Sequence, residues 1–207
     1  MPVRRTNHCG AASPAIAGRW LHAGALLLAM AACAGQGDEA APGEKAEVPM
    51  SMNLSSPAFE RDAPIPAIHT CDGDEVSPPL HWSGVPAEAK SLVLIVDDPD
   101  APDPAAPQRT WVHWVLYNLP ADAGGLPQGV SRIQLPEGTR EGSNDWKRTG
   151  YGGPCPPIGR HRYFHKLYAL DTVLPDLHQP TKAELLEAVE GHVLAQAQLV
   201  GTYQRGR

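Results

Sequence analysis

The sequence predicts an all-β sandwich of mostly antiparallel sheets with one α-helix near the C-terminal end. Three observations carry this prediction: several apolar runs of strand length, long irregular connections between them, and a single stretch with helical period. The chain has 207 residues, of which 42% are hydrophobic, so it can bury one core and is expected to form one domain. Its 22 prolines and 20 glycines are scattered among the apolar runs, which favours a loop-rich globular fold over disorder.

The clearest strand is predicted in residues 91–102, SLVLIVDDPDAP, where a continuous apolar and β-branched run stops at acidic residues and prolines. Such a run is typical of a strand that is buried on both faces. Two further strands are predicted in residues 111–120, WVHWVLYNLP, and in residues 162–171, RYFHKLYALD. Shorter strands are predicted in residues 51–59 and 77–86, where prolines mark the turns.

Helical period appears once, in residues 181–198. Thr181 and Glu184 have the spacing of a capping box, which satisfies free backbone groups at the start of a helix. Apolar residues then recur at helical spacing: Leu185, Leu186, Val189, Val193 and Ala197. We therefore expect one amphipathic helix over residues 181–198, packed on the sandwich and weakened in its middle by Gly191.

Residues 1–32 are expected to be a signal peptide and not part of the fold. They contain three arginines and no acidic residue, and the apolar stretch at residues 20–32 is too short to span a bilayer comfortably. Small residues lead to Cys33, and the sequence LLLAMAAC is similar to the lipobox of bacterial lipoproteins, in which the cysteine becomes the lipid-modified N-terminus. Ordinary cleavage near Ala32 and an uncleaved N-terminal anchor are the alternatives.

Residues 33–49 are small, polar and acidic, so we expect a flexible tether between the lipid anchor and a folded domain at residues 50–207. Without residues 1–32 the chain has 14 basic and 23 acidic residues, a net charge of −9. Such a surface repels nucleic acid and anionic lipid, so no nucleic-acid partner is expected and membrane attachment would come from the lipid anchor alone. The predicted location is the cell envelope, facing the periplasm.

Two cysteines, Cys71 and Cys155, lie in Gly/Pro-rich loops of the predicted domain. An exported location permits a disulfide between them, which would pin the two loops together. Two partly buried free thiols are the alternative, because the sequence does not give the distance between them.

Four polar side chains lie at predicted strand ends or on a strand: Asp98, His113, His161 and Tyr163. Strict alternation along residues 111–120 would place His113 on the same face as Trp111 and Val115. A lone histidine on such an apolar face is commonly a buried residue bonded to a backbone carbonyl. Convergence of Asp98 and His161 at the same end of a sheet would instead make a site.

Four motifs follow one another along the chain: VDDPDAP at residues 96–102, WVHW at 111–114, GYGGPCPP at 150–157 and HRY at 161–163. In this order they resemble the motifs of the phosphatidylethanolamine-binding protein family. The segments CDGDEVSPPLHWSGVP and GTYQR resemble the bacterial branch of that family, which is similar to Raf kinase inhibitor protein. Two departures, a short approach to HRY and His69 in place of a common tyrosine, leave the loop length and the local packing open.

The resemblance implies a large central antiparallel sheet with a smaller sheet on one side, and a small pocket for phosphate-like anions at one edge. Carried over by position, the ligand-binding residues would be Asp98, Pro102, Trp111, His113, Gly153, Cys155, Pro157, His161 and Tyr163.

The chemistry of these residues is compatible with anion binding. Backbone N–H groups in a glycine-rich turn can form a concave nest of partial positive charge, which the prolines would hold rigid. A carboxylate within ~4–6 Å raises the pKa of a histidine, so Asp98 is expected to hold the histidines cationic. Affinity for an anion would then decline as the pH rises through about 7 to 8. Alternatively, Asp98 accepts a ligand ammonium or hydroxyl.

Binding of a small phosphorylated or otherwise anionic ligand is therefore the favoured function, with modulation of an unidentified protein partner as a variant. The alternative is a metal-dependent or acid/base hydrolase that uses Asp98, His113 and His161. Their spacings match no metal-ligand motif, so neither a metal nor another cofactor is expected. The absence of a GxSxG motif argues against covalent hydrolysis by a serine. A third hypothesis is a lipid-anchored structural protein whose pocket is vestigial.

Two further groups of residues are expected to have no role in the site. The segment GSNDW at residues 142–146 could line the entrance of the pocket, but it has ordinary turn chemistry and is left outside the predicted site. The remaining histidines of the domain are expected on the surface or on the helix: His81, His165, His178 and His192.

Overall fold

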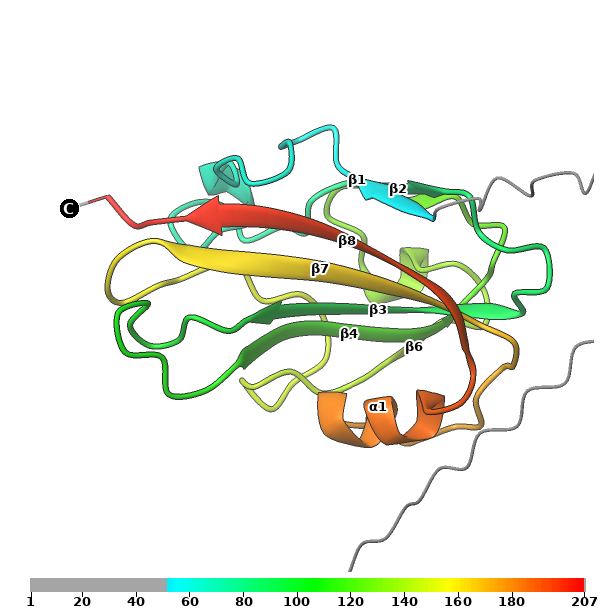
Figure 1. The fold of residues 1–207 in the computed structure, drawn as a ribbon. Coiled ribbons are helices and arrows are strands. Elements are labelled where there is room, and N and C mark those ends of the chain that lie inside the picture. The colour runs from blue at the N-terminus through cyan, green and yellow to red at the C-terminus, as the bar shows by residue number, and fades with distance from the viewer. Residues whose placement is uncertain (1–51, 207) are drawn as a thin grey trace, which may run out of the picture. The chain divides into compact units, whose positions relative to one another are not determined.

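The computed structural model describes residues 52–206, which form two antiparallel sheets, one α-helix and two short 3-10 helices (Figure 1). The larger sheet has the strand order β6-β4-β3-β7-β8, with β3 (Ser91–Asp98), β4 (Trp111–Leu119), β6 (Arg140–Glu141), β7 (His161–Leu170) and β8 (Val193–Tyr203). The smaller sheet has the order β1-β2-β5, with β1 (Asn53–Ser55), β2 (Leu80–Ser83) and β5 (Gly125–Leu126). The helices are η1 (Ala67–His69), η2 (Arg132–Gln134) and α1 (Lys182–Val189). The predicted mainly β class is confirmed.

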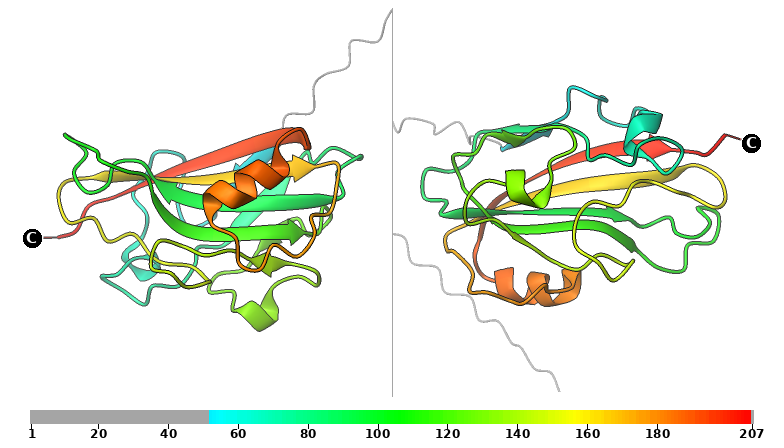
Figure 2. Two further views of the ribbon diagram at one scale, coloured as in Figure 1. Left: turned by 90° about the horizontal axis from the view of Figure 1, so that it is seen from below. Right: turned by 180° about the vertical axis from the view of Figure 1, so that it is seen from behind.

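The central strand β3 is buried along its whole length, because both of its faces are covered. On one face, Leu92 and Leu94 pack in a core that includes Trp82 of the smaller sheet. On the other face, Val93 and Ile95 pack in a second core that includes Leu185 of α1. Figure 2 shows α1 lying across this second face. Burial of each large apolar side chain contributes about 1.5–3 kcal/mol, so the uninterrupted apolar run explains the central position of β3.

The end of α1 differs from the sequence prediction. The predicted helix over residues 181–198 stops at Val189, and the chain turns at Gly191, which has a φ of 79°. Glycine tolerates this left-handed conformation at little cost and commonly ends helices. Residues 193–203 then form β8, which pairs with β7 along the whole length of that strand. The prediction was wrong for residues 193–198, where helical and strand patterns overlap.

β8 has the alternating pattern of a half-buried strand. Ala195, Ala197 and Leu199 pack on the core between the sheets, while Gln196 and Gln198 face the other way. The backbone of β7 would otherwise form an unpaired sheet edge, and pairing with β8 satisfies its N–H and C=O groups.

His165 also differs from the sequence prediction, which placed it on the surface or on the helix. It lies in β7, pairs with Val96 of β3 and Leu199 of β8, and is 1% exposed. Its ring packs 5.5 Å from the ring of Phe59, and neither ring nitrogen has a hydrogen-bond partner among residues 52–206. Burial lowers the pKa of His165 to about 4.

Candidate functional site

A cavity of about 300 Å³ lies at the end of the larger sheet where β3 ends and β4 and β7 begin. These three strand ends meet because β3 is antiparallel to both neighbours. The cavity is lined by Asp98, Ala101, Pro102, Arg109, Trp111, His113, Trp146, Cys155, Pro156, Pro157 and His161.

Seven of the nine residues that the resemblance implies for ligand binding line this cavity: Asp98, Pro102, Trp111, His113, Cys155, Pro157 and His161. Gly153 and Tyr163 lie behind the lining. The backbone N–H of Gly153 donates to Oε1 of Glu75 at 3.1 Å. Tyr163 is 1% exposed and belongs to the core, with its ring 5.2 Å from that of His113. The geometry thus gathers most of the set, while binding itself stays a prediction.

His113 reaches the cavity because β4 contains a bulge. Val112 pairs with Asp97 and Trp114 pairs with Val96, so His113 is an extra residue with no partner in β3. Beyond the bulge the strand faces are exchanged, and Val115 packs with Val112 on the helix side of the sheet. The prediction from strict alternation, that His113 and Val115 share a face, was therefore wrong.

His113 lines the cavity as a neutral ring with one unbonded acceptor nitrogen. Its Nδ1 lies 2.7 Å from the carbonyl oxygen of Gly152 and donates to it. Its Nε2 is buried and has no hydrogen-bond partner among residues 52–206. Burial lowers the pKa of His113 to about 4. The expectation that His113 is cationic is therefore wrong, because the effect of desolvation on its pKa outweighs the attraction of the nearby carboxylates.

The nearby carboxylate of Asp98 instead pairs with His161. Nδ1 of His161 lies 2.7 Å from Oδ2 of Asp98, and Nε2 lies 3.0 Å from the carbonyl oxygen of Ile158. The other carboxylate oxygen of Asp98 accepts the backbone N–H of Asp100 at 2.8 Å. Burial raises the pKa of Asp98, although the hydrogen bond from His161 acts in the opposite direction.

The loop after β3 is held by an ion pair. Asp100 accepts hydrogen bonds from the guanidinium of Arg162 at 2.6 and 2.9 Å and from the Arg162 backbone N–H at 2.9 Å. These bonds lower the pKa of Asp100. The Ala101–Pro102 peptide that follows is cis, and Pro102 lines the cavity. Bidentate pairs of this kind fix geometry as well as contribute energy. Arg162, near the start of β7, therefore holds the loop after β3 in place as a wall of the cavity.

The opposite wall is held by a disulfide between Cys71 and Cys155, whose Cα atoms are 5.4 Å apart. Of the two alternatives left by the sequence, the structure contains the bonded form. The backbone N–H of Cys71 also donates to the carbonyl oxygen of Pro154 at 3.1 Å. The glycine-proline loop is thereby fastened to the loop that follows η1.

Two backbone N–H groups of the glycine-proline loop, which is expected to form a nest for an anion, are already bonded within the protein. The N–H of Gly152 donates to the carbonyl oxygen of His113 at 3.0 Å, and that of Gly153 is taken by Glu75. The prolines of the loop have no N–H to offer. A Cβ added at Gly152 would lie 2.4 Å from the ring of Trp146. These glycines therefore permit close packing of the cavity wall.

Four lining residues lie outside the predicted set: Ala101, Arg109, Trp146 and Pro156. The guanidinium of Arg109 lies 4.2 Å from the ring of Trp111, a cation–π contact. The ring of Trp146 lies 5.2 Å from the rings of Trp111 and His113. A tryptophan in the otherwise polar stretch GSNDW is the signal that could have identified Trp146.

Trp146 is positioned by the two residues before it. Oδ2 of Asp145 accepts the backbone N–H of Val112 at 2.8 Å, which ties the loop to the start of β4. Oδ1 of Asn144 accepts the backbone N–H of Trp146 at 3.0 Å. The segment expected to be an ordinary turn therefore carries a wall of the cavity.

Residues 52–206 contain no group of three histidine, cysteine, aspartate or glutamate side chains arranged to hold a metal ion. In that part of the chain, no helix combines the length and the hydropathy needed to cross a membrane. The predicted signal peptide, Cys33 and the tether lie outside the described residues.

Comparison with known proteins places these features in context. The sequence profile of the family described as phosphatidylethanolamine-binding protein matches residues 55–204. A UPF0098 protein from Methanothermobacter thermautotrophicus is 53% identical over 156 residues, which cover 75% of this chain and 100% of that protein.

Two solved structures have the same fold. A phosphatidylethanolamine-binding protein homologue from Chlamydia trachomatis has a TM-score of 0.70 and 44% identity, over 76% of this chain and 99% of that one. YBCL of E. coli, described as a member of the mammalian PEBP family, has a TM-score of 0.68 and 31% identity, over 75% and 99% of the two chains.

Proposed function

The chain belongs to the phosphatidylethanolamine-binding protein family, and from this premise we propose that it is a binding protein whose cavity around His113 holds a small phosphate-type anion. The cavity volume of about 300 Å³ suits a head group or a small phosphate ester better than a whole lipid.

The observation that carries the proposal is the buried, unpaired Nε2 of His113 in the cavity wall. A buried acceptor without a partner costs about 1–3 kcal/mol, which a hydrogen bond from a ligand recovers. A phosphate monoester near its second pKa of about 6 carries both an O–H group and negatively charged oxygens. It can therefore donate to His113 while its charge is attracted to Arg109.

The rest of the lining supports an organic substituent on the phosphate. The rings of Trp111 and Trp146 meet edge to face beside His113, and Pro156 and Pro157 add apolar surface. Apolar walls with a few convergent polar groups are typical of sites for small organic ligands.

The proposal is tested by titrating the purified full chain with phosphoethanolamine and with inorganic phosphate while the thermal midpoint is followed. We expect millimolar phosphoethanolamine to raise the midpoint of the wild type. The rise should be lost in His113→Asn and in Arg109→Ala, and kept in His81→Asn, which alters an exposed histidine of β2. No ligand-dependent shift in the wild type would contradict the proposal and favour a vestigial cavity.

The hydrolase alternative is less well supported by the same geometry. Both carboxylate oxygens of Asp98 already accept hydrogen bonds, one from Asp100 and one from His161. His161 has both ring nitrogens engaged, one by Asp98 and one by the carbonyl oxygen of Ile158. A metal bound by all three side chains would have to break one of these two bonds, whereas the bond of His113 to Gly152 is compatible with metal binding at Nε2. Metal analysis of the purified protein tests this directly, and a stoichiometric, tightly held metal would favour the alternative.

Export to the cell envelope and lipidation of Cys33 are part of the same proposal, and the sequence LLLAMAAC supports them. The disulfide between Cys71 and Cys155 is also consistent with an oxidising compartment. Mass spectrometry of the N-terminal peptide and membrane fractionation of Cys33→Ser test this part. An unmodified Cys33, or membrane association that does not change in the variant, would contradict lipidation.

A further inference from the structure

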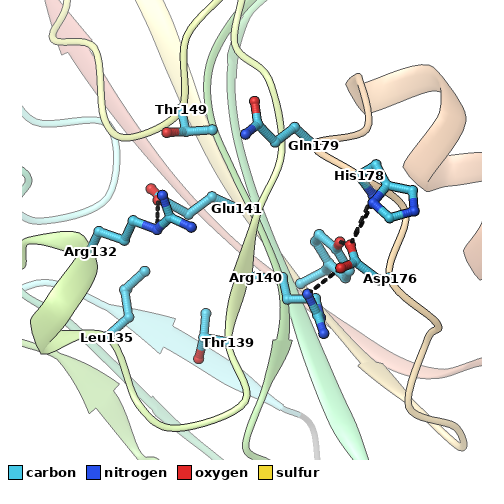
Figure 3. A pocket seen from close by; sticks show the side chains of 10 residues that line it. Arg132, Leu135, Thr139, Arg140, Glu141, Thr149, Asp176, His178 and Gln179 are labelled. Carbon is cyan, nitrogen blue, oxygen red and sulfur yellow. Dashed lines mark hydrogen bonds and ion pairs between the residues drawn. The ribbon is translucent and has the colours of Figure 1, made fainter.

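A second cavity, of about 290 Å³, lies against β6 and the far part of β4 (Figure 3). Tyr117 in its lining follows Trp111 of the first cavity by six strand residues, which corresponds to roughly 20 Å along β4. The second cavity is lined by Tyr117, Arg132, Leu135, Thr139, Arg140, Glu141, Thr149, Asp176, His178 and Gln179.

Glu141 is the buried charge of this cavity. Its side chain is 9% exposed, and burial raises the pKa of its carboxyl group more than its neighbours lower it. The neighbouring groups are Nε of Arg132, at 3.7 Å, and the backbone N–H of Gly150. A carboxylate can accept about four hydrogen bonds, so most of the acceptor capacity of Glu141 is unused.

The cation that faces Glu141 is only loosely held. The side chain of Arg132 is 80% exposed, and its 3.7 Å separation from Glu141 exceeds hydrogen-bond length. Figure 3 shows the guanidinium of Arg132 reaching the Glu141 carboxylate across the cavity. A ligand cation could therefore take its place beside Glu141 and leave Arg132 free for another charge.

The other side of the cavity is firmly built. Asp176 accepts a hydrogen bond from Arg140 at 2.6 Å, and the backbone N–H of Leu177 donates to the hydroxyl of Tyr117 at 3.1 Å. His178 and Gln179 follow, with φ values of 54° and 60°. Two consecutive residues other than glycine in the left-handed region are uncommon, so this segment is held in a conformation that local preference does not explain.

The charges of the lining balance. Arg132 and Arg140 are matched by Glu141 and Asp176, which leaves separated charges of both signs with no net charge. The cavity has the volume of roughly ten water molecules in the liquid, which is more than enough room for a small amino acid. Thr149 and Gln179 add uncharged polar groups near Glu141 (Figure 3).

We propose that this second cavity binds a small zwitterion of amino-acid type, with the ligand ammonium on Glu141 and the ligand carboxylate on Arg132. The ammonium replaces Arg132 as the partner of the buried carboxylate, and its three N–H donors use acceptor capacity that a guanidinium 3.7 Å away leaves unused. The released Arg132 then binds the ligand carboxylate. The site is independent of the phosphate-type anion proposed for the first cavity.

Three probes of matched shape test the proposal by titration calorimetry on the purified full chain. L-Serine is the zwitterion, ethanolamine is serine without its carboxylate, and glycerate has a hydroxyl in place of the ammonium. We expect saturable millimolar binding of L-serine, and at least tenfold weaker binding of ethanolamine and of glycerate. Absence of saturable serine binding, or equal binding of either single-charge probe, would overturn the proposal.

Variants locate the site. Glu141→Gln should weaken serine binding at least tenfold, and Glu137→Gln, an exposed neighbour outside the lining, should leave it within twofold. His113→Asn should also leave it unchanged. Because Glu141→Gln could affect folding, amide chemical shifts of the wild type give a second readout. Serine should shift the amides of Thr139, Thr149 and Gln179, and shifts confined to the first cavity would contradict the assignment.

Discussion

Nδ1 of His161 lies 2.7 Å from Oδ2 of Asp98, and this buried pair joins the start of β7 to the end of β3. The pairing separates the two histidines of the first cavity by role. His161 has an acceptor at each ring nitrogen, whereas His113 has one bonded nitrogen and one that remains available to a ligand. The carboxylate of Asp98 therefore bonds to His161 beneath the cavity and leaves His113 available to a ligand.

Asp98→Asn should destabilise the protein by about 1–3 kcal/mol, the usual cost of disturbing the hydrogen bonds of a buried polar group. Removal of the carboxylate leaves the His161 ring, which is 0% exposed, without its charged partner. Urea unfolding at pH 7 measures the change. Asp122→Asn alters an exposed aspartate and should change stability by less than about 0.5 kcal/mol. Equal stabilities of the two variants would show that the pair contributes nothing.

Acid should destabilise the protein between pH 6.5 and about 4. Burial lowers the pKa of His113 and of His165 to about 4, below the usual value of 6.5. In this window the unfolded chain binds more protons, so stability is complete above pH 6.5 and falls as the pH decreases, by about 3 kcal/mol for each histidine. The raised pKa of Asp98 opposes this in part, because folding then takes up a proton.

Urea midpoints at pH 7 and pH 4.5 measure the acid effect, and His165→Leu should remove roughly half of it. A wild type with the same stability at both pH values would contradict the burial of neutral rings.

Reduction of the disulfide should lower both stability and ligand affinity. The bond joins Cys71 to Cys155, which are 84 positions apart in the sequence, and loss of such a bond typically costs about 2–5 kcal/mol. Cys155 lines the first cavity, so the freed loop should also weaken phosphoethanolamine binding. Unfolding and binding are compared with and without dithiothreitol, and Cys71→Ser/Cys155→Ser is the control that should not respond. A wild type that is equally insensitive would rule out a contribution from this bond.

Gly152→Ala should displace Trp146 from the wall of the first cavity. The added Cβ would lie 2.4 Å from the indole ring, and overpacking of this kind costs about 1–3 kcal/mol. The intrinsic fluorescence should change and phosphoethanolamine affinity should fall. Gly206→Ala, where a Cβ meets no atom within 4 Å, serves as the control. An unchanged spectrum in Gly152→Ala would contradict the packing of Trp146.

The sequence predicted the elements that depend on local pattern. The buried run of β3 needs no partner to be recognised, because acidic residues and prolines mark its end. Proximity of Asp98, His113 and His161 was predictable from the order of motifs and from antiparallel pairing. The start of α1 was also predictable, since Thr181 and Glu184 form the capping box.

Features that depend on distant partners were not predictable. The change from helix to strand after Gly191 depends on pairing with the edge of β7. The local propensity of residues 193–198 carries no information about that distant strand. The bulge at His113 depends on the register between β4 and β3. The neutral state of His113 follows from burial. Trp146 enters the cavity because its loop, far from the start of β4 in the sequence, folds against Trp111.

The pH dependence of phosphoethanolamine affinity tests most directly whether His113 accepts a ligand proton. Calorimetry at pH 6, 7 and 8 should give an affinity that falls by up to about tenfold per pH unit above the second phosphate pKa of about 6, because a proton must lie between His113 and the phosphate. His113→Asn should bind weakly at every pH. Affinity that is constant or rises toward pH 8, or no saturable binding at all, would contradict the proposed function.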